Sequence, residues 1–310
     1  MEPSQTAIEG QPIDPAADNV PPVTAAATGV APAAAISPQA CSTCGSSPAA
    51  TPGMPIVPSC IYVIGHIEPR FPQLSIEKEA RQAIARGGVS KETDREVMAK
   101  LLRDPANKYI VRRLCWVLSV QDVDTYILVP RDGDYQPLID AYRAEPNPAD
   151  LELVIGVRGP IANPEICNGL LVPIVIFDQI YAFDRGALLK AIPQPKDADQ
   201  KFTKAAAEMF DRIAAQMDNA GATDCDRALN YLAVRYDRIY SLAAEQFANN
   251  ASFTGIDCLP SPLNGSRTIV DVVFSFTDRS TDVVSKYFTR VDVTECFPFL
   301  VTKMSPYYDR

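Results

Sequence analysis

Histidine occurs only once in the 310 residues, at position 66. Any Ser-His or Cys-His mechanism would therefore depend on His66, and a partly exposed structural histidine is the preferred interpretation there. The sequence also lacks a Gly-x-Ser-x-Gly elbow, a Gly-x-x-x-x-Gly-Lys-Ser/Thr loop and a Gly-x-Gly-x-x-Gly turn. These absences argue against an α/β-hydrolase and against the motif-defined nucleotide-binding proteins.

Basic residues are missing from the first 65 positions, and the whole chain has a net charge of −9. A secretory signal begins with a basic segment, so we expect a cytoplasmic protein. The longest basic run is Arg112-Arg113. Because nucleic acids and anionic membranes need clustered Lys and Arg, neither is an expected partner. No apolar run approaches the roughly 18 residues of a membrane-spanning helix.

Residues 1–58 hold eleven prolines, many alanines and no aromatic residue. Such a segment cannot bury enough apolar surface to offset its chain entropy, so we predict a disordered tail. Residues 59–310 have the mixed composition of a folded body, which predicts a single domain.

Eight cysteines in an apparently cytoplasmic chain are better interpreted as reduced thiols, metal ligands or redox groups than as a disulfide framework. Cys41 and Cys44 have the Cys-x-x-Cys spacing at which two thiolates reach one tetrahedral Zn²⁺. Cys115 and Cys167 are the preferred second pair. The prediction is a structural zinc that pins the tail to the body and leaves no coordination site for water. The competing interpretation is unbound reduced thiols.

The pattern of the body predicts an α+β fold with a mixed β-sheet flanked by helices. Amphipathic helices are expected at 75–86 and 91–103, with N-caps at Ser75 and Ser90. A helical hairpin is expected near 198–247, its second helix beginning with a capping box at Thr223. Strands are expected at 60–68, 109–120, 124–130, 152–158 and 171–182, and a C-terminal β-hairpin joins 269–276 to 286–293.

Several runs of the body resemble a known family. They are YVIGHIEPRFP at 62–72, LCWVL at 114–118, VIGVRGPI at 154–161, CNGL at 167–170, DNAGATD at 218–224, RALNYLAVRY at 227–236 and VDVT at 291–294. On these runs, residues 59–310 resemble the C-terminal domain of unknown function of the cyanobactin maturation proteins PatA and PatG. No catalytic residue is carried over from that domain.

The resemblance implies a role in maturing ribosomally made, post-translationally modified peptides. We therefore expect a non-catalytic accessory module that binds a precursor peptide or a peptide-processing enzyme, for example at an exposed sheet edge. One alternative is a cysteine- or metal-dependent peptide-modifying enzyme with Cys115 or Cys167 as its reactive thiol. A second alternative is a dimerisation domain that forms a homodimer.

Overall fold

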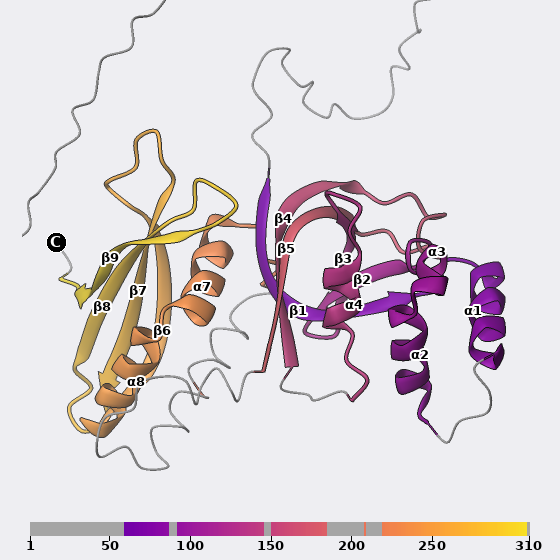
Figure 1. Ribbon diagram of the computed structural model, residues 1–310. Coiled ribbons are helices and arrows are strands. Elements are labelled where there is room, and N and C mark those ends of the chain that lie inside the picture. Colours follow the sequence, from indigo (N-terminus) through magenta and orange to yellow (C-terminus); the bar gives the residue numbers. More distant parts are fainter. Residues whose placement is uncertain (1–58, 87–91, 146–149, 185–207, 209–218, 309–310) are drawn as a thin grey trace, which may run out of the picture. The chain divides into compact units, whose positions relative to one another are not determined.

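A computed structural model describes residues 59–86, 92–145, 150–184, 208 and 219–308. The predicted tail, including Cys41 and Cys44, lies outside the described residues. Two sheets are present, so the α+β class is confirmed (Figure 1). None of the helices in this part of the chain is both long and apolar enough to cross a membrane.

The first sheet is a closed five-stranded barrel in the order β1-β2-β3-β5-β4. Its strands are β1 (Cys60–Arg70), β2 (Cys115–Val120), β3 (Val123–Pro130), β4 (Asp150–Ile161) and β5 (Pro173–Asp184). Only the pair of β3 and β5 is parallel. Side chains alternate across each strand, so Ile61, Val63, Trp116 and Leu118 belong to the barrel core while Tyr62 belongs to a different cluster.

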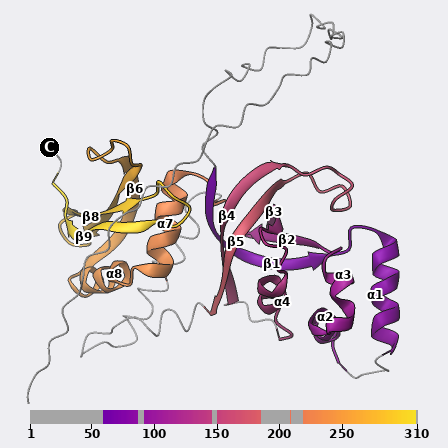
Figure 2. The same cartoon turned by 45° about the horizontal axis from the view of Figure 1, so that its top comes forward.

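Helices flank the barrel and share its core. They are α1 (Leu74–Arg86), α2 (Asp94–Arg103), the short η1 (Pro105–Asn107), α3 (Lys108–Val111) and α4 (Gln136–Ala141). The first three α-helices gather in one group beside the barrel (Figure 2). Ile76, Ala80 and Leu102 are almost fully buried against the barrel core. This group of helices creates the groove that is considered below.

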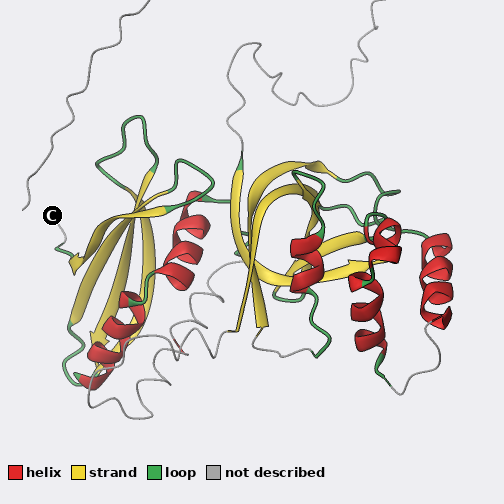
Figure 3. Ribbon diagram, viewed as in Figure 1, coloured by secondary structure: helices red, strands yellow, loops and turns green. Residues whose placement is uncertain are grey.

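The second sheet is antiparallel in the order β6-β7-β8-β9. Its strands are β6 (Ala251–Pro260), β7 (Ile269–Asp278), β8 (Val284–Asp292) and β9 (Phe299–Pro306). Two helices, α7 (Asp224–Arg235) and α8 (Arg238–Ala248), cover one face of this sheet (Figure 3). Leu229 and Leu232 of α7 pack there with Phe274 of β7. The predicted C-terminal hairpin is confirmed as the pair of β7 and β8.

Two hydrogen bonds, which join Gly221 and Asn230 to Tyr62, attach α7 and the segment before it to β1, and we call this contact the hook. The Tyr62 amide donates to the Gly221 carbonyl at 2.9 Å, and the Asn230 side chain donates to the Tyr62 carbonyl at 2.8 Å. Gly221 has a φ of +65°, which L side chains rarely adopt. The hook therefore depends on a glycine at this position.

Several predicted helix and strand boundaries differ from the structure, and the expected N-cap Ser75 lies inside α1, which begins at Leu74. The expected strand 109–120 begins only at Cys115, because the Asp104 side chain caps η1 and the chain continues into α3. Thr93, not Ser90, caps α2 through a capping box with Glu96. The helix that starts after the predicted Thr223 capping box ends at Arg235, and α8 follows it. The first helix of the expected hairpin lies outside the described residues, apart from Glu208.

Candidate functional site

The structure joins Cys115 and Cys167, the expected second pair of zinc ligands, in a disulfide. Both are 3% exposed, and they pack with Val117 and Ile127 on the outer side of β2. A cysteine binds zinc as a thiolate, so this pair could serve zinc only after reduction of the disulfide. Within the described ranges, no group of three or more His, Cys, Asp and Glu residues could hold a metal. The four-cysteine zinc site therefore stays a prediction.

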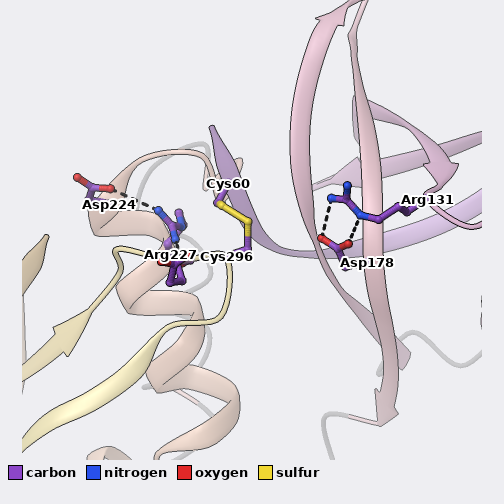
Figure 4. The surroundings of a disulfide bond; sticks show 7 residues. Cys60, Arg131, Asp178, Asp224, Arg227 and Cys296 are labelled. Atoms are coloured by element: carbon purple, nitrogen blue, oxygen red, sulfur yellow. Dashed lines mark hydrogen bonds and ion pairs between the residues drawn. A yellow bond between two sulfur atoms is a disulfide. The ribbon is translucent and has the colours of Figure 1, made fainter. Parts of the chain in front are cut away.

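Four further cysteines also form disulfides, which differs from the expectation of reduced thiols. Cys60 of β1 is bonded to Cys296, 236 residues later (Figure 4). Cys225 of α7 is bonded to Cys258 of β6. The first bond links a barrel strand to the segment before β9, and the second links a helix to the sheet that it covers.

The single histidine lies on β1 beside a buried carboxyl group. The His66 Nδ1 atom is 4.0 Å from Glu152 Oε2, and the histidine side chain is 44% exposed. Glu152 is only 4% exposed and accepts a hydrogen bond from the Ile67 amide at 3.2 Å. Desolvation by burial raises the pKa of Glu152 from 4.5 to about 7, and the Ile67 hydrogen bond opposes this shift. The pair places a carboxyl group that titrates near neutral pH beside the barrel.

Burial of Glu152 makes stability depend on pH. The folded carboxyl holds its proton up to about pH 7 while the unfolded one loses it near 4.5, so stability is lost as pH rises between these values. We expect wild type to lose about 3 kcal/mol relative to Glu152→Gln between pH 4.5 and 7.5, at about 1.4 kcal/mol for each unit of pKa shift. Urea unfolding of both proteins at three pH values measures this. Parallel profiles would show that Glu152 titrates normally.

A groove of about 1030 Å³ runs along α1 and α2. Its floor includes the buried Ala80 and Leu101, and partly exposed apolar side chains stand above them. Those partly exposed side chains are Phe71, Ala83, Ile84, Val97 and Met98. The volume is at the upper end of the roughly 300 to 1000 Å³ typical of small-ligand pockets, so it has room for a short peptide segment.

The charges along the groove are mainly acidic. Four carboxylates and two cations line it. Arg81 pairs with Glu77 at 2.5 Å, and Lys100 pairs with Glu92. The two further carboxylates are those of Asp94 and Asp104. An occupant with an apolar face and a basic residue would complement this lining.

The expected peptide site at a sheet edge is partly covered at β9. The Leu300 amide donates to the Tyr231 hydroxyl at 3.2 Å, and the Met304 amide donates to the Tyr236 hydroxyl at 2.9 Å. Both tyrosines lie on or directly after α7. These two backbone donors of β9, one of the two edge strands of the sheet, are satisfied within the protein, and we take the α1 and α2 groove as the candidate site. Sequence analysis predicted both helices but not the groove.

Comparisons with known proteins agree with the resemblance drawn from sequence. Residues 196–307 match the family model described as PatG C-terminal. The fold is similar to a solved structure described as "PatG Domain of Unknown Function", with a TM-score of 0.64 and 20% identity over 80% of this chain and 98% of that chain. At this identity the structural match shows the fold alone. No curated protein matches the chain. The resemblance to the PatG C-terminal domain is thereby confirmed.

Proposed function

We propose, on the premise that this chain is a relative of the PatG C-terminal domain, that it is a non-catalytic accessory module of a modified-peptide pathway. The groove between α1 and α2 binds a segment of the precursor peptide. The observation that carries this proposal is the apolar floor of the groove with acidic side chains along it. We infer a cyanobactin-type pathway from the family resemblance, and we infer how the peptide binds from the groove.

The dimensions of the groove favour a helical segment. The 13 residues of α1 give the groove a wall of roughly 20 Å. An amphipathic helix of three to four turns has this length and can lay its apolar side chains into a groove. The acidic tail of the chain itself, with Glu2, Glu9, Asp14 and Asp18 and no basic residue, lacks the matching charge. A separate peptide is therefore the proposed occupant.

A charge placed in the groove is expected to weaken peptide binding. The probe is a fluorescein-labelled 12-residue helical peptide with a leucine stripe and one terminal lysine. We expect Ile84→Arg to raise its Kd at least tenfold, about 1.4 kcal/mol, because the new cation opposes both the apolar face and the lysine. Fluorescence anisotropy measures the Kd.

The matched control is Leu74→Arg, which places the same charge on α1 at a 62% exposed leucine outside the groove. We expect this variant to change the Kd less than twofold. Equal losses for the two variants, or equal affinity for a peptide of the same composition with a scrambled order, would contradict the proposal. The pathway is tested separately: a short precursor gene beside this gene supports it, and its absence counts against it.

The proposed zinc and the proposed cytoplasmic location are connected through the cysteines. Disulfides persist in oxidising compartments and are uncommon in the cytosol. In a reducing cytoplasm, Cys115 and Cys167 would be thiols that could join Cys41 and Cys44 around a structural zinc. In an oxidising compartment, the disulfides would persist and the zinc site would not form.

Metal analysis under reducing conditions tests the zinc. We expect the reduced chain to hold one zinc per molecule, the oxidised chain none, and Cys41→Ser to abolish binding because three thiolates remain. Cys225→Ser is the matched control, and it should leave the zinc content unchanged. A reduced wild-type protein that binds no zinc rules the site out.

A further inference from the structure

One face of the second sheet points away from α7 and α8. Both helices pack on the face that carries Phe274 of β7 and Leu300 of β9 (Figure 1). Because side chains alternate along a strand, the residues between these point to the opposite side, which we call the outer face. The outer face includes Asp257 and Leu259 of β6, Asp271 and Val273 of β7, Phe288 and Arg290 of β8, and Phe299, Val301 and Lys303 of β9.

Large apolar side chains of the outer face are exposed at both edges of the sheet. Leu259 is 43% exposed on β6, and Phe299 and Val301 are 41% and 40% exposed on β9. Singly exposed apolar residues are ordinary on a protein surface, but these share one face of one sheet. Two sheets cover such faces when they pack against each other about 10 Å apart. The outer face therefore has the character of a docking surface for another sheet.

The outer face is divided into an acidic half, formed by β6 and β7, and a basic half, formed by β8 and β9. The charged residues are Asp257 and Asp271 in the first half and Lys286, Arg290 and Lys303 in the second. Asp271 and Arg290 pair at 3.0 Å where the halves meet. At one end of the sheet the buried Asp292 lies in the basic half, but it pairs with Arg267 at 3.4 Å. The outer face is therefore complementary in charge to a second copy of itself.

The division of charge selects one way of stacking two copies. A twofold axis parallel to the strands lays β6 of one copy over β9 of the other and β7 over β8, so each acidic half meets a basic half. A twofold axis across the strands would lay each strand over its own copy, so like charges would face each other. The first arrangement is favoured by the charges of the outer face.

The strand register brings matching side chains together in this arrangement. Leu259 of β6 and Thr302 of β9 lie at the same level of the sheet, because a continuous row of paired residues connects them. Val301 and Lys303 flank Thr302, and Lys303 is on the side toward which Asp257 lies. Leu259 of one copy therefore meets Val301 of the second copy, and Asp257 meets Lys303. Each contact occurs twice in the dimer.

We propose that the outer face binds a second copy of this chain across a twofold axis parallel to the strands. Four strands about 4.8 Å apart, with the eight residues of β9 as their length, give each copy a face of roughly 500 Å². The two copies together bury about 1000 Å², the lower end of the range for specific interfaces, so we expect a Kd of about 1 to 100 µM. The dimer goes beyond the proposed peptide groove on α1 and α2 and does not depend on it.

Sedimentation equilibrium of the full chain, with any free thiols alkylated, tests the dimer between 1 and 500 µM. Asp257→Lys and Lys303→Glu each place like charges at both contacts, so each should raise the dimer Kd at least tenfold. Lys78→Glu changes an exposed lysine of α1 and is the control with the same change of net charge as Lys303→Glu. We expect it to change the Kd less than twofold. A wild-type chain that stays monomeric up to 500 µM, or equal losses in control and test variants, overturns the proposal.

Combining the two substitutions in one chain tests which strands face each other. The double variant Asp257→Lys with Lys303→Glu has the net charge of wild type and opposite charges at both contacts, so its Kd should return to within threefold of wild type. Strands β6 and β9 are about 14 Å apart within one sheet, so a direct contact between the two positions arises only between copies. Melting curves establish that all variants are folded. A folded double variant that dimerises as weakly as the single variants contradicts the stacking of β6 over β9.

Discussion

Replacing both Cys60 and Cys296 by serine is expected to lower the free energy of unfolding of the oxidised protein by about 5 kcal/mol. The disulfide between them spans 236 residues, the longest separation among the three disulfides of the described chain. A cross-link stabilises the native state mainly by restricting the unfolded chain, and the effect grows with the logarithm of the closed loop. Urea unfolding under non-reducing conditions measures the change.

The control is the pair Cys225 and Cys258, which closes 33 residues. Its double serine variant should lose about 3 to 4 kcal/mol, less than the first because the loop is shorter. Under reducing conditions, wild type and the first variant should have nearly equal stability. If the first variant stays about 5 kcal/mol less stable after reduction, lost packing of Cys60, which is 6% exposed, is the cause and the cross-link is not.

Local patterns in the sequence were sufficient for much of the fold. The alternation in 269–276 and 286–293 predicts a hairpin, and the structure pairs Val273 with Phe288 there. The capping box at Thr223 is visible as two side chains three residues apart, and it is present. These features depend on neighbours in sequence, where periodicity and capping chemistry act directly.

Closure of the barrel depends on pairings that no local pattern carries. Strand β1 pairs with β4 some 90 residues later, as in Ile64 with Leu153, and β3 pairs in parallel with β5, as in Ile127 with Ile174. The sequence predicts most of these strands but not which edges meet, so it suggests one mixed sheet where the structure has two sheets. Strands β6 and β9 were missed because Gly255 interrupts the pattern of β6, and the adjacent polar residues Thr302 and Lys303 interrupt that of β9.

The candidate sites show the same limit. Cys115 and Cys167 were singled out as a pair, and they do meet, but spacing alone cannot tell a disulfide from half of a metal site. The buried side chains of Asn219 and Asn230, which exchange two hydrogen bonds, could not be predicted from the sequence, because a buried asparagine resembles an exposed one until the fold is known. The groove required the packing of α1 beside α2, which helical periodicity does not specify.

The hook between α7 and β1 provides a second large expected effect, through Gly221→Ala. A Cβ atom at this position would lie 2.5 Å from the Tyr62 carbonyl oxygen and 2.7 Å from Val63 Cα, both backbone atoms that cannot rotate away. The positive φ costs a side chain about 1 kcal/mol. Moving the strand would also weaken the hydrogen bond from the Tyr62 amide to the Gly221 carbonyl. Together we expect a loss of about 3 to 4 kcal/mol.

Gly133→Ala separates the contact from the backbone conformation. Gly133 has a nearly identical φ of +68°, but no atom lies within 4 Å of its hypothetical Cβ. This variant should lose only about 1 kcal/mol, the cost of the left-handed conformation alone. Thermal and urea unfolding of the two variants measure the difference, which we expect at about 2 to 3 kcal/mol, the cost of steric conflict with β1. Equal losses would mean that α7 is not held against β1 through Gly221.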